Sequence, residues 1–367
     1  MAKKYELSLA SDYVPTWTLI DAIRELFQNA LDEETLDPTN KMSVDYDPEE
    51  QKLHISSYKS TLTTHSLLLG ATTKASDKKT IGKFGEGYKI ASLVLLRLGY
   101  GMAIFNLNQG EIWRPRFVNS KRYQAKVLTF FVERIEMIPE VDMPSLTFLV
   151  DGITPDEYEA IIAANLHLQD VGDTRATQYG DVLMEDCYKG KIFINGLFVC
   201  ENKRITYGYN VKPEYLPIDR DRRIISDFDI QWLTSRMWSD ASQHTEKVID
   251  MLESGAPDTT YAKHHLTQAQ RNEVLHDFVD KYGENAVPVS TQSEAEGLPK
   301  NYKAVIVPEA MKDVIKSASE YEEPVYTEED ATVLERLNNW FERAYGFLPN
   351  KLCDEFRGLL EELENGN

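Results

Sequence analysis

Glu-Leu-Phe-Gln-Asn-Ala-Leu-Asp, at residues 25–32, is the stretch of this sequence from which the fold is inferred. Apolar residues recur around it at helical spacing, namely Leu19, Ile20, Ile23, Leu26, Phe27, Ala30 and Leu31. At about 100° per residue, Glu25, Asn29 and Asp32 fall within roughly 60° of one another on the opposite side. The pattern therefore predicts an amphipathic helix, with Thr18 as the residue that caps its start.

The polar side of this helix carries residue types that suit phosphate chemistry. A glutamate such as Glu25 can orient and deprotonate a water molecule for attack on a terminal phosphate. One turn later, Asn29 offers a neutral oxygen to Mg²⁺, which keeps several waters and bridges phosphate groups. A solvated polar face is the simpler interpretation of such a triplet when it stands alone, so the assignment depends on a second motif.

The second motif is Gly-Lys-Phe-Gly-Glu-Gly-Tyr-Lys at residues 82–89, directly before an apolar run over 90–98. The run predicts a buried helix. Glycines just before a helix, here Gly82, Gly85 and Gly87, let backbone N–H groups approach phosphate oxygens, and the helix dipole favours the anion. The spacing differs from that of a P-loop, which ends in Lys-Ser or Lys-Thr.

Taken together, the two motifs resemble those of the GHKL ATPases, as Glu25-x-x-x-Asn29-Ala30-x-Asp32 and then Gly82-x-x-Gly85-x-Gly87. This family includes gyrase B, the ninety-kilodalton heat-shock chaperones, the MutL proteins and the sensor histidine kinases. The resemblance extends over residues 1–165. It implies a Bergerat fold, an α+β sandwich in which helices cover one face of an antiparallel sheet.

The resemblance also implies roles for individual residues of this chain. It implies that Glu25 is the general base and that Asn29 binds Mg²⁺. Residues 70–89 are expected to form a mobile lid over the phosphates of a bound nucleotide, ATP in the first instance. The other residues that the resemblance places at the nucleotide are Asp32, Lys74, Gly82, Gly85, Gly87 and Lys89.

One part of the family pattern is altered in this sequence. The family has an Asp-x-Gly-x-Gly box after a strand, and its aspartate accepts a hydrogen bond from the adenine amino group. Here the strand predicted over 52–55 is followed by Ser57 at the aspartate position, and Lys59 and Thr61 replace the two glycines. Ser57 is therefore the expected contact to the base, and relaxed base selectivity is expected. A degenerate nucleotide site kept as a scaffold is the alternative.

A second region contains an arginine-rich segment over 215–223 that looks like part of the chaperone branch. In that branch an arginine from the middle domain reaches back to the nucleotide. A guanidinium suits this role because its fork can hold a phosphate oxygen and stabilise developing charge. Arg220 is the first choice for it and Arg222 the second. The competing interpretation is that these arginines pair with neighbouring aspartates.

Composition and length restrict the remaining possibilities. The formal charge of −20 argues against broad binding of nucleic acid, which needs a basic surface. Three scattered cysteines indicate a reducing cytoplasm, and no apolar run is long enough to span a membrane. The expected organisation is a nucleotide-binding domain over 1–168, a transducer-like region over 169–253, and a small α/β and helical region over 263–367.

The sequence thus predicts a cytoplasmic protein that hydrolyses a nucleotide, ATP in the first instance, with Mg²⁺ and couples this to a conformational change. A protein partner or a second copy of the chain is expected to respond to that change. The alternative is a non-catalytic interaction protein on a degenerate GHKL scaffold. A histidine kinase is a third option, disfavoured because no dimerisation helix with a phospho-accepting histidine is recognised before the first domain.

Overall fold

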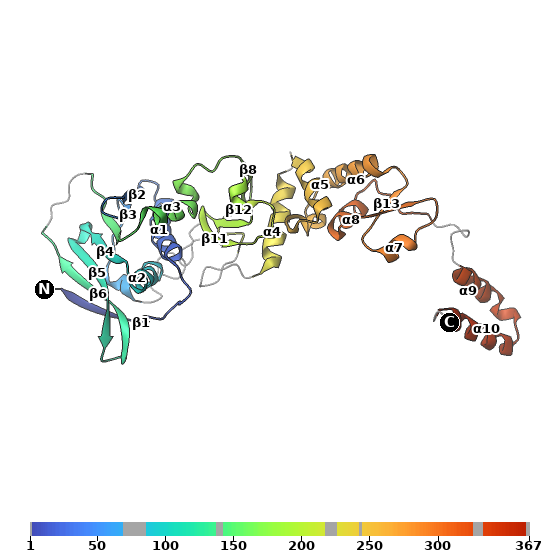
Figure 1. Cartoon of the computed structure of the whole chain (residues 1–367), viewed down its shortest axis with the longest axis horizontal. Coiled ribbons are helices and arrows are strands. Elements are labelled where there is room, and N and C mark those ends of the chain that lie inside the picture. The colour runs from blue at the N-terminus through green and yellow to red at the C-terminus, as the bar shows by residue number, and fades with distance from the viewer. Residues whose placement is uncertain are drawn as a thin grey trace. The chain divides into compact units, whose positions relative to one another are not determined.

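Of the 367 residues, the computed structural model describes 2–68, 86–136, 142–216, 226–241, 244–325 and 333–364. The chain forms two compact units, Met1–Asp240 and Ala241–Asn367. The boundary between them falls inside the region expected over 169–253. Figure 1 labels the helices and strands of both units.

The first unit is built on a seven-stranded sheet. Its strands lie in the order β1-β6-β5-β4-β7-β3-β2, and every neighbouring pair is antiparallel. Their bounds are β1 Lys3–Ala10, β2 Met42–Asp47, β3 Lys52–Ser57, β4 Gly101–Asn106, β5 Glu111–Ser120, β6 Ala125–Arg134 and β7 Leu146–Asp151. The alternating residues over 42–46 and 52–55, on either side of the turn-forming residues 47–50, predict a hairpin, and β2 and β3 form it.

Helices cover one face of this sheet (Figure 1), and they are α1 Leu19–Leu36, α2 Gly87–Leu98 and α3 Pro155–Ala163. The start of α1 is fixed by a capping box, in which the Thr18 N–H donates to the Asp21 carboxylate at 2.8 Å. Side chains alternate between the two faces of a strand, and Leu53 and Ile55 of β3 are both buried, on the face that α1 contacts. The core therefore lies between the sheet and the helices.

A second, five-stranded sheet follows in the same unit, in the order β11-β10-β12-β9-β8. Its strands are β8 Thr174–Thr177, β9 Gly180–Leu183, β10 Lys191–Ile194, β11 Leu197–Glu201 and β12 Gly208–Val211. The Asn-Gly pair at 195–196 predicts a turn within the apolar run over 191–199, and this turn joins β10 to β11, with φ of 48° at Asn195 and 78° at Gly196. Helix α4 (Asp227–Asp240) packs on this sheet, and its Trp238 Nε1 donates to the Tyr209 hydroxyl at 2.8 Å.

The second unit begins with a small α/β module. Strands β13 (Ala286–Val289) and β14 (Lys303–Ile306) form a parallel pair. The helices of the module are α5 Thr245–Ser254, α6 Gln268–Tyr282, α7 Gln292–Glu296 and α8 Glu309–Lys316. The linker expected over 254–262 is instead packed structure, because it contains a short 3₁₀ helix in which Asp258 and Thr259 are buried.

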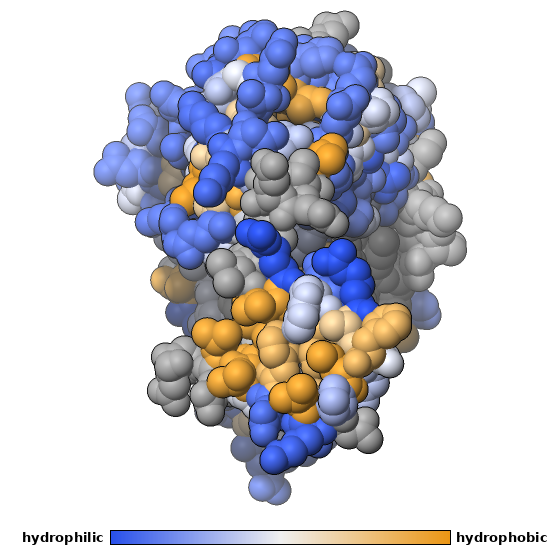
Figure 2. Space-filling view, turned by 90° about the vertical axis from the view of Figure 1, so that its right-hand side faces the viewer, coloured by the Kyte–Doolittle hydropathy of each residue, from blue (hydrophilic) through white to orange (hydrophobic). Residues whose placement is uncertain are grey.

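Two further helices, α9 (Val333–Ala344) and α10 (Asn350–Glu364), form a hairpin with its own small core. Figure 2 shows apolar side chains exposed at this end of the chain, in the lower half of the view.

The coarse fold is therefore as predicted: mixed α+β, with an antiparallel sheet, helices and a helical C-terminal region. Strand β1, at the edge of the large sheet, was not anticipated. Its signal is weak, because only Leu7 and Leu9 alternate as buried residues in a segment that starts with charged side chains. In the described part of the chain, no helix has both the length and the apolar character needed to cross a membrane.

Candidate functional site

The polar residues singled out on α1 are covered and do not form a solvated face. Glu25 is 2% exposed and Asp32 is fully buried, while Asn29 is half-buried. Helical spacing places them on one side of α1, and α2 packs against that helix. The simpler interpretation of the triplet, a solvated surface stripe, is therefore excluded.

The first residue of α2 brings the two sequence motifs together. A Cβ atom built on Gly87 would lie 2.8 Å from Glu25 Oε2 and 3.3 Å from Asn29 Nδ2. A separation of 2.8 Å is closer than a real Cβ atom tolerates, so any larger residue at position 87 would have to displace the Glu25 carboxylate. Residues 62 positions apart in the sequence thus meet at one point, with the start of a 12-residue helix beside a carboxylate and an amide.

Polar contacts along α1 orient these side chains. Asn29 Nδ2 donates to the backbone carbonyl of Glu25 at 2.8 Å, so the amide oxygen is the atom that is directed away from the helix backbone. Asp32 accepts a hydrogen bond from Gln28 Nε2 at 3.5 Å. Arg24 Nη2 lies 3.7 Å from Glu25 Oε1, which puts a positive charge next to the candidate base.

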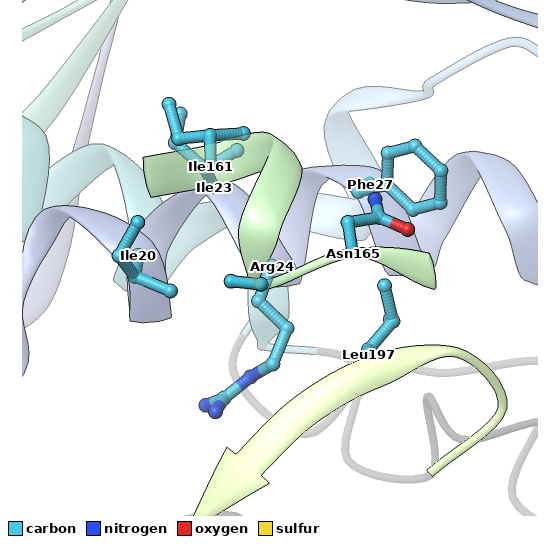
Figure 3. A pocket seen from close by; sticks show the side chains of 8 residues that line it. Ile20, Ile23, Arg24, Phe27, Ile161, Asn165 and Leu197 are labelled. Atoms are coloured by element: carbon cyan, nitrogen blue, oxygen red, sulfur yellow. The ribbon is translucent and has the colours of Figure 1, made fainter. Parts of the chain in front are cut away.

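The opposite side of α1 contacts the second sheet. Arg24 Nη1 donates to the backbone carbonyl of Phe198 in β11 at 3.4 Å, and the rings of Phe27 and His167 stack at 5.9 Å. Figure 3 shows the small pocket at this seam, lined by Ile20, Ile23, Arg24, Phe27, Ile161, Ala164, Asn165 and Leu197.

That pocket has room for little more than a water molecule, so it is not a nucleotide site. Its importance lies in Arg24, whose guanidinium is next to both Glu25 and the second sheet. Arg24 was not singled out from the sequence. The available signal was a charged residue at the edge of the apolar face of α1, directly before the candidate base.

Ser57 ends β3 and is buried on the same face as Leu53 and Ile55, because strand side chains alternate. This is the helix-covered face of the sheet. The Ser57 carbonyl accepts a hydrogen bond from Ser145 Oγ at 3.3 Å, and the same hydroxyl donates to the Ser60 carbonyl at 2.6 Å. Ser57 thus stands where the family pattern has an aspartate, and its backbone carbonyl is held by the Ser145 hydroxyl.

The chain after Ser57 is held by amide side chains from neighbouring segments. Asn40 Oδ1 accepts from the backbone N–H of Lys59 at 2.7 Å. Asn106, fully buried at the end of β4, donates to the Leu62 carbonyl at 2.8 Å and accepts from the Thr61 hydroxyl at 3.1 Å. Lys59 and Thr61, which stand where the family pattern has glycines, thus belong to a segment that is held on both sides by hydrogen bonds with Asn40 and Asn106.

Lys89 has a different environment from the one that its motif suggests. Its side chain is fully buried, and its amino group donates to the backbone carbonyls of Ser66 at 2.7 Å and Leu68 at 2.6 Å. Ser66 belongs to the 3₁₀ helix η1 (Thr64–Leu67), so Lys89 ties α2 to that turn. Burial lowers the pKa of Lys89 to about 8. Its predicted contact with phosphate stays a prediction.

Several residues predicted at the site lie outside the described part of the chain. They are Lys74, Gly82, Gly85, Arg220 and Arg222, together with most of the lid expected over 70–89. The described site therefore consists of the α1 side chains, the start of α2, Ser57 and Lys89.

Two comparisons relate this chain to known proteins, and the family match lies over the second sheet. Residues 156–238 match the family described as the Mycoplasma pneumoniae MPN635 N-terminal domain. A protein of Mycoplasma pneumoniae (strain ATCC 29342 / M129 / Subtype 1), named only as uncharacterized, is 26% identical over 219 residues, which are 57% of this chain and 86% of the relative. The family match includes the five-stranded sheet and leaves out Glu25, Asn29 and Gly87, so it assigns no chemistry to the site.

The burial of Lys89 predicts a pH-dependent stability. Its pKa is about 8 in the folded chain and about 10.5 when unfolded, so the folded state loses the proton first as the pH rises. The free energy of unfolding should therefore increase between pH 8 and 10.5, by up to about 1.4 kcal/mol per pH unit relative to Lys89→Met. After Lys89 loses its proton, its neutral amine still has two N–H groups, which is enough to donate to the carbonyls of both Ser66 and Leu68.

Urea titrations of wild type and Lys89→Met at several pH values measure this difference. All other titratable groups are common to both proteins, so their contributions to the pH dependence cancel in the difference. The methionine does not titrate, so the remaining pH dependence comes from Lys89. If the difference in free energy of unfolding between the two proteins stays constant from pH 8 to pH 10, burial does not lower the pKa of Lys89.

Proposed function

We propose that the junction of α1 and α2 hydrolyses a nucleoside triphosphate, ATP in the first instance, with Mg²⁺. The observation that carries the proposal is the contact of Gly87 with Glu25 and Asn29, since a Cβ at Gly87 would lie 2.8 Å from the Glu25 carboxylate. Two motifs with the residue types of a GHKL ATPase thereby form one site. The antiparallel sheet with helices on one face is consistent with the Bergerat fold that we propose for this unit.

The described side chains fit the chemistry that is required. The Asn29 amide is held by its nitrogen, so its oxygen can serve as a neutral ligand of the kind that Mg²⁺ accepts. Mg²⁺ would neutralise the phosphate charge. The Glu25 carboxylate lies beside Gly87 at the start of α2, where Glu86 is the N-cap residue and where backbone N–H groups and the helix dipole favour an anion. In this proposal Glu25 takes the proton of the attacking water.

Coupling to conformational change is part of the proposal, and Arg24 provides the physical connection. Its guanidinium lies 3.7 Å from Glu25 and donates to β11 of the second sheet. A movement of that sheet would change the electrostatic environment of the base. The predicted roles of Arg220 and Arg222 at the phosphates remain proposals of the same kind, as does a cytoplasmic location.

The first test replaces the candidate base. Glu25→Gln keeps the size of the side chain but cannot accept the proton, so phosphate release from ATP or GTP should fall about 10²–10⁴-fold while nucleotide binding is retained. Glu33→Gln, on the same helix two turns later, is the matched control and should keep the wild-type rate. Release at the wild-type rate by Glu25→Gln would refute its role. No hydrolysis by wild type, with binding retained, would favour the non-catalytic alternative.

A second test adds one methyl group at the junction. Gly87→Ala places a Cβ against the Glu25 carboxylate, while alanine is itself the better helix former by about 1 kcal/mol. We therefore expect at least a tenfold loss of phosphate release with little loss of thermal stability. Gly297→Ala, where a Cβ would meet only ordinary contacts at 3.7 Å, is the control. Equal activity of both variants would mean that the junction is not the site.

The third test concerns the metal. Asn29→Ala removes the amide oxygen that we assign to Mg²⁺. Calorimetric titration should show a loss of nucleotide affinity of roughly ten- to a hundredfold in Mg²⁺ and a much smaller loss in chelator. The same loss under both conditions would show that Asn29 contacts the nucleotide directly or acts only through the fold.

A further inference from the structure

The α9–α10 hairpin has an interior of its own, formed entirely by hairpin residues. Phe341, Cys353 and Leu360 are buried there, and partly buried apolar side chains pack around them. The rings of Phe341 and Phe356 stack at 4.8 Å and join the two helices. The described part of the hairpin, residues 333–364, is shorter than the roughly 40 residues below which small domains usually need disulfides, metals or oligomerisation.

One side of this interior is left open by a stripe of apolar side chains. Leu352, Leu359 and Leu363 are 49%, 57% and 55% exposed, and their spacing of seven and four residues puts them on one side of α10. Trp340 of α9 is 47% exposed, and its ring lies 5.5 Å from that of Phe356. Figure 2 shows an apolar patch at this place. We call these four residues, Trp340 and the three leucines, the outer stripe.

The size of the outer stripe is unusual for so small an element. About half of each side chain is exposed, which leaves roughly 300–400 Å² of apolar surface. That is as much as the largest patch on a whole monomeric protein, about 300–600 Å². Elsewhere on the hairpin the Arg357 guanidinium lies over the rings of Phe341 and Tyr345, at 5.8 and 5.1 Å, while Tyr345 and Phe347, at the turn between the two helices, are 48% and 90% exposed.

We propose that a second copy of this chain covers the outer stripe, so that two hairpins form a four-helix bundle across a two-fold axis. A self-complementary patch is what such symmetry requires, and a bundle of four helices encloses a core that one hairpin leaves open. The stripe runs along α10, whose 15 residues span about 22 Å. Two copies can therefore pair over the whole length of the helix.

The charges along α10 favour an antiparallel pairing. Its first half contains Lys351 and Arg357 together with Asp354 and Glu355 and is neutral on balance, whereas three of its last four residues are glutamates. A parallel arrangement would bring the two acidic ends together. An antiparallel arrangement separates these ends and places Lys351 next to the acidic end of the partner, where opposite charges attract and the helix dipoles are also opposed.

The test is the mass of the full-length chain in solution without nucleotide, which keeps it independent of the proposed hydrolysis. Sedimentation equilibrium between about 0.5 and 50 µM should give twice the chain mass for wild type. Leu352→Glu with Leu359→Glu should weaken dimerisation roughly a hundredfold or more, because each carboxylate would be buried against an apolar surface. Leu98→Glu is the control, since Leu98 is 46% exposed at the end of α2, and it should remain a dimer.

A surface charge reversal provides a second variant that leaves the hairpin interior untouched. Lys351→Glu should weaken the dimer by about tenfold at low salt and less at high salt, because the interaction is screened. Circular dichroism and thermal unfolding establish that every variant is folded. A monomeric wild type over the whole concentration range would overturn the proposal. A dimer that survives the two leucine substitutions would also overturn it, since the chain would then associate through another surface.

Discussion

The approach of α2 to α1 is the constraint on which the candidate site depends, and it exists because residue 87 has no side chain. The backbone of Gly87 occupies space that a Cβ would share with the Glu25 carboxylate. This close contact buries Glu25 and brings Asn29 to the start of α2. Buried polar groups are costly unless they are paired, so such an arrangement is maintained only with local compensation. Arg24 and the helix carbonyl that holds Asn29 supply part of it.

The same helix is also the physical connection between the two sheets of the first unit. On one side α1 contacts α2 at Gly87, and on the other side Arg24 and Phe27 contact residues at the second sheet. Because Arg24 directly precedes Glu25 and also contacts Phe198, the coupling that we propose would reach the candidate base through one side chain. Residues 156–238, which match the family, include the second sheet. The contacts of Arg24 and Phe27 therefore connect the matched region to the helix that carries the candidate base.

The sequence was informative where a local pattern decides the outcome, and less so where packing does. Helical periodicity and the Thr18 cap predict α1, and the Asn195–Gly196 turn predicts the β10–β11 hairpin. Periodicity gives the direction of Glu25 relative to its neighbours, but it cannot show that α2 covers that direction. Lys89 is predicted as a cation for phosphates, and sequence shows its charge but not its burial. In the fold its amino group donates to two backbone carbonyls, and the predicted contact with phosphate stays a prediction.

The neutral chemistry around Ser57 has a consequence for any bound base. At the end of β3, the Ser145 hydroxyl holds the carbonyls of Ser57 and Ser60, while the hydrogen bond between Ser56 and Thr147, at 2.9 Å, lies on the other face of the sheet. A buried carboxylate would accept only, and would therefore select an amine over a carbonyl. A hydroxyl can donate or accept, so it distinguishes less between the two. Burial of a charge at this position would also need a partner, whereas a serine is accommodated at little cost. If a nucleotide binds here, its affinity must therefore come mainly from the phosphate end, where Glu25, Asn29 and the start of α2 converge.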